Sequence, residues 1–260
     1  MRIISLSVDG IHQAAARGLF DWFADQDADI ICLQDLRCQE YETDDPVFHP
    51  EGYNAYFFDS GVKHYNGVAI YSRVLPKALI YGFGFSSGVD MEGRYLQIDF
   101  DNLSIGTLLA PSAMSSAESQ EVKAKFFDDL QAHLIKIARK RRDFIFCGNW
   151  SMAPSREDVS NPNDQQQQSG FLPEEQHWMK QLPHIGYIDA FRQGNPDKDE
   201  YSWWPSGNLD EGDAWRTDLQ VVSASLKNRV EYAMIYKRQL FSSHLPVIVD
   251  YDIELEPDDF

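Results

Sequence analysis

The chain has 260 residues, of which 43% are hydrophobic and 13% aromatic, and its formal charge at pH 7 is −18. Length and hydrophobic content suit a single α/β domain, which we expect to span residues 1–260. No run of about 18 apolar residues is present, which excludes a transmembrane helix, and the first residues lack the apolar core of a signal peptide. The acid excess excludes attachment to naked nucleic acid by bulk charge, so a nucleic-acid role needs a local basic patch or a basic partner.

The three cysteines, Cys32, Cys38 and Cys147, are an odd number and form neither a CxxC motif nor a zinc-type spacing. Two of them lie within apolar stretches that are typical of strands, so we expect buried, reduced thiols. These features indicate a cytoplasmic protein without a membrane partner. The free protein is expected to be a monomer.

Along the chain, residues 3–8 alternate and are rich in β-branched side chains, which predicts a strand. The apolar spacing over residues 11–24 predicts a helix with one buried face. The short apolar run at 30–33 indicates a central strand that is covered on both sides. Further strands are expected at residues 67–71, 95–100 and 105–109.

The clearest helix is expected over residues 118–138, because apolar side chains recur on one side of it. Those side chains are Val122, Phe126, Leu130, Leu134 and Ile137. A strand follows at 144–147, a polar loop at 155–170, and a short helix at 173–182 that begins with proline. The last strands are expected at 221–222 and 247–251. Many strands with few helices predict a four-layered α/β sandwich, in which two stacked mixed sheets are flanked by helices.

Several of these expected strands end in short motifs. They read RIISLSVDG at the start, ADIICLQDL at 28–36, CGNWSMAP at 147–154, WRTDLQVVS at 215–223 and SSHLPV at 242–247. Such segments have the pattern of a metal-dependent phosphodiesterase, which needs oxygen ligands for a metal, a base to activate water and donors for the phosphoryl oxygens. In order and over essentially the whole chain, they resemble the exonuclease III/AP endonuclease branch of the endonuclease–exonuclease–phosphatase superfamily.

The resemblance implies eight active-site positions in this chain. They are Ser7, Asp35, Leu109, Asn149, Ser151, Asp218, Ser243 and His244. Only Asp218, in an intact Arg-x-Asp motif, and His244 keep the residue type of the nucleases. The glutamate of the family is shortened to Asp35, and the other five positions carry a side chain of a different kind.

These differences predict that the chain is not an enzyme and holds no metal or other cofactor. Asn149 cannot act as a base, whose contribution is typically about 10² to 10⁴ in rate. The shortened side chain of Asp35 would misplace a ligand, and a shift of about 1 Å can cost roughly 100-fold. With serine at Ser243, we expect His244 to have no carboxylate that fixes its tautomer.

Segments such as ICLQDLR at 31–37, GVAIYSR at 67–73 and YSWWP at 201–205 resemble one branch of the superfamily, the catabolite repression control (Crc) proteins. This resemblance implies a non-catalytic regulator of carbon metabolism. Such a regulator acts with the RNA chaperone Hfq on A-rich leader segments of mRNA and represses translation.

A basic cluster lies at the end of the long helix and places five cations within seven residues. Its members are Lys136, Arg139, Lys140, Arg141 and Arg142. Cations at a helix C-terminus complement the helix dipole, but five are more than this requires, so we expect contacts to RNA phosphates or to an acidic partner. Trp203 is a further candidate, as a stacking platform for a base, because one of the adjacent Trp203 and Trp204 should face outward.

Two alternatives stay open. The first is a divergent Mg²⁺-dependent nuclease of the exonuclease III/AP endonuclease type in DNA repair, in which Asp9, Asp35 and Asp218 would share the metal ion. The second is a scaffold that binds only a protein partner and no RNA.

Overall fold

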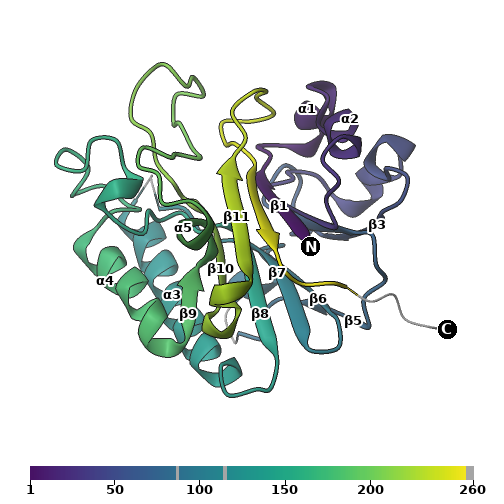
Figure 1. Ribbon diagram of the computed structural model, residues 1–260. Coiled ribbons are helices and arrows are strands. Elements are labelled where there is room, and N and C mark those ends of the chain that lie inside the picture. Colours follow the sequence, from purple (N-terminus) through teal and green to yellow (C-terminus); the bar gives the residue numbers. More distant parts are fainter. Residues whose placement is uncertain (86–87, 114–115, 256–260) are drawn as a thin grey trace.

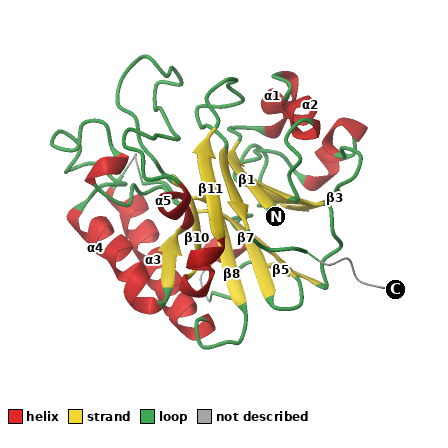
Figure 2. Ribbon diagram, viewed as in Figure 1, coloured by secondary structure: helices red, strands yellow, loops and turns green. Residues whose placement is uncertain are grey.

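The structure is a computed structural model that describes residues 1–85, 88–113 and 116–255. Two six-stranded sheets stack face to face, and helices flank them on the outside (Figures 1 and 2). The predicted four-layered α/β sandwich is therefore confirmed. Among the described residues, no helix combines the length and the apolar character needed to span a membrane.

The first sheet has the strand order β11-β12-β1-β2-β4-β3, in which only β1 and β2 are parallel neighbours. Its strands are β1 (Arg2–Ser7), β2 (Ile30–Gln34), β3 (Asn54–Phe58), β4 (Val68–Ser72), β11 (Val230–Ile235) and β12 (Val247–Tyr251).

The second sheet has the order β5-β6-β7-β8-β10-β9, and here only β7 and β8 run parallel. Its strands are β5 (Ala78–Tyr81), β6 (Tyr95–Asp99), β7 (Leu103–Leu109), β8 (Asp143–Asn149), β9 (Tyr187–Asp189) and β10 (Asp218–Ser223).

The helices are short except for one. They are α1 (Ile11–Ala16), α2 (Leu19–Ala24), α3 (Ala117–Ile137), α4 (Pro173–Gln181) and α5 (Ala190–Gly194). Short 3₁₀ helices lie at Glu40–Thr43, Pro46–Phe48, Gly88–Met91, Arg156–Asp158, Leu182–Ile185 and Ala224–Arg229.

The alternation of side chains along a strand explains the layers, as β8 shows. Ile145 and Cys147 point into the core between the two sheets, whereas Phe144 and Phe146 pack with residues of α3 and α4 on the outer face. On the other side of the sandwich, α1 and α2 cover the outer face of the first sheet. Both faces of the central strands are therefore buried.

Most predicted elements are present, with local differences. The single helix expected over 11–24 is two helices, because Gly18 between them takes a left-handed conformation with φ 85°. In α3 the buried face differs from the predicted one at its first position. Val122, which was expected to be buried, is exposed, and its neighbour Lys123 is buried. The sequence pattern missed β3, β5, β9 and β11, which are the edge strands of the two sheets.

The topology brings distant chain segments together at one end of the sandwich, where several strands begin or terminate. The parallel strands β1 and β2 end there at Ser7 and Gln34, and β7 and β8 end there at Leu109 and Asn149. Because β10 runs antiparallel to β8, it begins at the same edge with Asp218, which pairs with Asn149.

Candidate functional site

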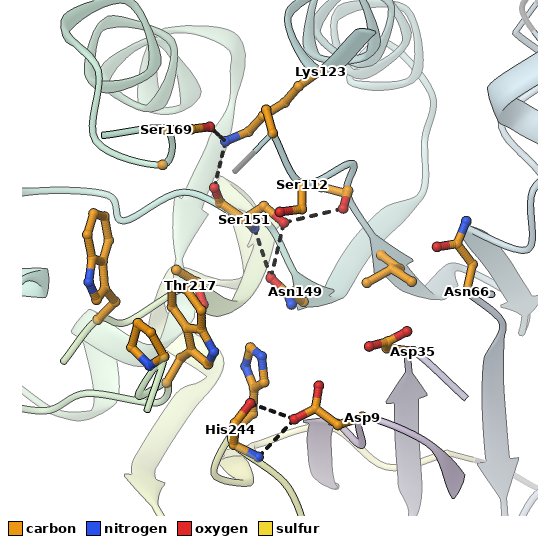
Figure 3. Close-up of a pocket in the computed structure, with 18 of the residues that line it drawn as sticks. Asp9, Asp35, Asn66, Ser112, Lys123, Asn149, Ser151, Ser169, Thr217 and His244 are labelled. Atoms are coloured by element: carbon orange, nitrogen blue, oxygen red, sulfur yellow. Dashed lines mark hydrogen bonds between the residues drawn. The ribbon is translucent and has the colours of Figure 1, made fainter. Parts of the chain in front are cut away.

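A cavity of about 430 Å³ opens at this edge between the ends of the two sheets. The sequence-predicted residues that line it are Asp35, Leu109, Asn149, Ser151, Trp203, Ser243 and His244. Of these, Asp35, Asn149, Ser151 and His244 are labelled in Figure 3. Ser7 and Asp218 do not line it, because both are buried behind the cavity wall. The loops that follow the strand ends thus gather most of the predicted site.

Backbone strain is concentrated around this cavity. Eight described residues other than glycine have a positive φ, and five of them line it. These five are Asp9, Asp35, Arg37, Asn66 and Ser151, with φ between 50° and 57°. Few non-glycine residues take a left-handed conformation, although Asp and Asn tolerate it best, and a cluster of them around a cavity is typical of a functional site.

His244 and Asp218 form a buried pair at the base of the cavity. His244 Nδ1 lies 2.8 Å from Asp218 Oδ2, and the Ser202 hydroxyl donates to the same oxygen at 2.6 Å. The expectation that His244 lacks a carboxylate partner is therefore wrong. The partner is not the neighbour in sequence, Ser243, but the first residue of a strand 26 positions away.

The charged form of His244 is favoured in this position. Burial alone would lower the pKa of His244, but the charge and hydrogen bond of Asp218 outweigh it, with Asp9 and Asp35 adding to the effect, so that the pKa is raised. Since Nδ1 contacts Asp218, the other ring nitrogen remains for a group in the cavity.

The ring of Trp203 packs on one face of the His244 imidazole. Its ring stacks on His244 with a centroid distance of 5.7 Å and an interplanar angle of 20°. Trp203 is half-buried and lines the cavity, whereas Trp204 is buried in the core between the sheets. One of the two adjacent tryptophans is thus a core residue, as expected from their spacing.

Asp9 and Asp35 face the cavity from the ends of β1 and β2 (Figure 3). Asp9 Oδ2 accepts hydrogen bonds from the backbone N–H and the hydroxyl of Ser243, at 2.9 and 2.5 Å. Burial would raise the pKa of Asp9, but the charge of His244, the hydrogen bonds from Ser243 and the charge of Arg37 lower it. Asp9 therefore stays ionised and ties the loop before β12 to β1.

A third group joins these carboxylates. One terminal nitrogen of Arg37 lies 3.2 Å from Asp9 Oδ1 and 2.7 Å from Asp35 Oδ2. Sequence reasoning overlooked Arg37, although it follows Asp35 by two residues in the same motif.

Asn149 and Ser151 organise the β8 side of the cavity. The side-chain carbonyl of Asn149 accepts from the Ser151 backbone N–H at 2.9 Å, and the Ser151 hydroxyl reaches Ala110 O at 3.3 Å (Figure 3). Ser7, by contrast, has no hydrogen-bond partner for its hydroxyl among the described residues. The amide and hydroxyl at 149 and 151 thus hold the loop.

Lys123 is a second residue that the sequence pattern missed. Its side chain is 1% exposed, pairs with Glu175 at 2.6 Å and donates to Ser151 O at 2.7 Å. Burial lowers the pKa of Lys123, and the charge of Glu175 opposes this. A lysine at a core-facing position of an amphipathic helix was the available signal, and its role is to fasten α3 to the Ser151 loop.

The basic cluster lies away from this site. It begins in the last turn of α3 and ends just before β8, which runs from Asp143 to its cavity end at Asn149, so the cluster and the cavity are separated by roughly 20 Å of strand. Arg142 is engaged in structure, because it donates to Leu103 O, Ser104 Oγ and Asp101 O. The other four cations, Lys136, Arg139, Lys140 and Arg141, are exposed.

The cavity thus holds a buried His–Asp pair and two carboxylates at the open end of a stacked α/β sandwich. The model of the Endonuclease/Exonuclease/phosphatase family matches residues 8–244. The chain belongs to this family.

Relatives and solved structures agree with this assignment. An exodeoxyribonuclease of Bacillus subtilis is 32% identical over 251 residues, which cover 95% of this chain and 98% of that protein. The DNA repair nuclease APEX1 of Danio rerio is 29% identical over 252 residues, or 95% of this chain and 81% of that protein. The structure of an AP endonuclease from Archaeoglobus fulgidus superposes with a TM-score of 0.87 at 23% identity, covering 97% of this chain and 100% of that one.

These relatives correct the prediction that the chain is a pseudoenzyme. Proteins that are 27–32% identical to it over nearly its whole length are named as nucleases, which points to an enzyme. The prediction counted missing groups one at a time along the sequence. It did not foresee that Asp218 supports His244 across the fold.

The family resemblance implies Mg²⁺ in this cavity, and the donor set does not fit a resident ion. Mg²⁺ requires near-octahedral oxygen ligands, commonly including one or two carboxylates. Asp9 and Asp35 are already bridged by Arg37, and Asp218 is buried behind His244. Over residues 1–85, 88–113 and 116–255, no three acidic, histidine or cysteine side chains are grouped to hold a metal. The trio Asp9, Asp35 and Asp218 therefore does not form a shared site.

Proposed function

We propose that this protein binds nucleic acid in the cavity and hydrolyses a phosphodiester bond, as a nuclease of the exonuclease III/AP endonuclease type. The observation that carries the proposal is the buried His244–Asp218 pair at the base of a strained, charged cavity. The names of the relatives support DNA as the substrate.

In the proposed reaction, a water oxygen attacks phosphorus and the bond from phosphorus to the leaving oxygen breaks. Protonated His244 donates a proton to the leaving oxygen, and Asp218 keeps the imidazole charged and oriented. Asp35 accepts the proton of the water, because only one of its oxygens is bound by Arg37 among the described contacts. Trp203 provides a face on which a base stacks, a contact that is worth about 1–3 kcal/mol.

The test is cleavage of duplex DNA that carries either an abasic site or a recessed 3′ end, with Mg²⁺ and with EDTA. Wild type is expected to cleave one of these two DNA substrates. In His244→Gln the cleavage rate should fall by about 10²-fold or more. His184→Gln is the matched control, because His184 is exposed and does not line the cavity. Equal rates for wild type and His244→Gln would refute the proposed role of the pair.

A second function is favoured by the four exposed cations of the basic cluster, none of which forms an ion pair within the described part of the chain. We infer that this surface binds RNA or an acidic group of a partner, in a cytoplasmic assembly with Hfq on A-rich mRNA leaders as in the Crc branch. Few phosphate contacts bind weakly at physiological salt, which favours assembly with a partner over binding of free RNA.

A mobility-shift titration tests this second function with A-rich RNA, this protein and Hfq, singly and together. A further shift is expected only when both proteins are present, and Arg139→Glu with Arg141→Glu should weaken it. Lys227→Glu with Arg238→Glu is the control, because it reverses two exposed cations outside the basic cluster. Unchanged assembly in the first double variant would contradict this function.

A further inference from the structure

Arg37 reaches the cavity because of its backbone. Its φ of 50° is left-handed, and its N–H is held by Asn66 O at 2.7 Å, next to the bond from Leu36 N to Gly67 O. This turn follows the end of β2 and sends the guanidinium back across the strand ends. There it donates to both Asp35 and Asp9, and also to the Asp9 carbonyl at 3.3 Å.

The two carboxylates need a cation at this place. The side chain of Asp9 is 26% exposed and that of Asp35 17%, so water compensates their charges only in part. One guanidinium nitrogen contacts an oxygen of each, which is the position from which a single cation neutralises both. Burial opposes the charged form of Arg37, but the hydrogen bond and charge of Asp35 and the charge of Asp9 raise its pKa.

A divalent ion and Arg37 exclude each other here. An ion bound by the same oxygens would lie against a guanidinium, which stays protonated at every accessible pH and cannot be removed by titration. Arg37 also retains donors that the described chain does not use, since a guanidinium has five. These donors can meet phosphate oxygens with a charge-assisted geometry that suits arginine.

We infer that Arg37 is the resident cation of the cavity: between Asp9 and Asp35 it takes the place of a divalent metal ion and prepares the site for a phosphate group. The inference rests on the proposed function for the identity of the ligand. It concerns metal binding, however, and is tested without measuring cleavage.

The experiment is calorimetric titration of Mg²⁺ alone into four proteins. Wild type is expected to give no saturable Mg²⁺ binding, whereas Arg37→Gln should gain a saturable site that binds at least about tenfold more tightly than the weakest binding the titration detects, or about 1.4 kcal/mol. The gain should disappear in Arg37→Gln with Asp35→Asn. Arg73→Gln is the matched control, because Arg73 pairs with one exposed carboxylate, Asp27, at 2.7 Å and lies outside the cavity.

Mg²⁺ binding by wild type as tight as by Arg37→Gln would overturn the inference. Circular dichroism of the same samples checks that each variant is folded. If Arg37→Gln is unfolded, Mg²⁺ titrations of wild type and of the single variant Asp35→Asn are compared instead. Saturable binding by wild type that Asp35→Asn loses would then overturn the inference, and no binding by either would support it. If Arg37→Gln gains Mg²⁺ and wild type cleaves no DNA, the inference stands and the proposed nuclease function fails.

Discussion

The two ends of the sandwich hold their charged residues in opposite ways. At the cavity end, residues far apart in sequence converge and bind one another, as Asp9 does with Arg37 and Asp218 with His244. At the end where β8 begins, the basic cluster is contiguous in sequence, and four of its five cations are exposed. A dense run of charge is thus a surface feature of this protein, and its built site comes from dispersed residues.

The largest effect is expected from Asp218→Asn, which would remove the charge that supports His244 while keeping the shape of the side chain. The cleavage rate should fall by about 10² to 10⁴, with a pH–rate profile in which the His244 step moves to lower pH. Arg141→Glu should leave this rate unchanged. An unshifted profile in Asp218→Asn would mean that the pair is only structural.

A large loss of stability is expected from Asp158→Ala near the cavity end. Asp158 is 1% exposed and accepts from Arg216 at 2.7 Å and from Arg192 at 2.6 Å. Without Asp158, the buried Arg216 keeps only Asp189, at 2.6 Å, as its ion-pair partner among the described residues, and loss of the buried pair should cost about 3–5 kcal/mol in the free energy of unfolding.

Chemical denaturation measures this loss. Glu200→Ala, which breaks the more exposed pair with Lys237, should cost about 0–1 kcal/mol. Similar losses in Asp158→Ala and Glu200→Ala would show that burial does not decide the strength of these pairs.

The His244–Asp218 pair also predicts a dependence of stability on pH. The folded pKa of His244 is raised above its ordinary value of about 6.5, so its contribution to stability is complete below about pH 6.5 and is lost as pH rises through the folded pKa. The free energy of unfolding of wild type relative to His244→Gln should therefore decrease with pH above about 6.5. A difference that grows with pH would indicate that His244 is neutral when folded.

The smallest expected effects are on the free energy of unfolding, and they distinguish two neighbouring members of the basic cluster, Arg142 and Arg141. Arg142→Ala should cost about 1–2 kcal/mol, because its guanidinium holds the turn between β6 and β7 through three acceptors. Arg141→Ala, at the exposed neighbour, should change the free energy of unfolding by less than about 0.5 kcal/mol. Thermal unfolding of the two variants side by side is sufficient, and equal losses would contradict the distinction.

Much of the fold could be predicted because its signals are local. The buried run of β2, the long apolar face of α3 and the proline at the start of α4 each follow from side-chain spacing or backbone geometry. Edge strands such as β5 escaped, because Ala78–Tyr81 is largely exposed and shows no buried face. The break between α1 and α2 at Gly18 was not predicted, because the apolar spacing of the sequence continues across it.

The site could be predicted only where a residue belongs to a motif. His244 and Asp35 were found in this way, and tertiary contacts then changed what they mean. The partner of His244 is Asp218, and Arg37, which binds Asp35 locally, also binds the distant Asp9. Lys123 was missed because a buried lysine is rare and its partner Glu175 is 52 residues away.

By itself, the sequence determined the class of fold, the order of its elements and the segments that supply the site, because periodicity and motifs are properties of neighbouring residues. Only the tertiary structure decided which charges meet. Parallel strands that end at a common edge bring Asp9 and Asp35 to one guanidinium, and an antiparallel strand starts beside them with the carboxylate that His244 needs. The strength of these charges depends on burial and on distances of a few ångströms, which no linear pattern contains.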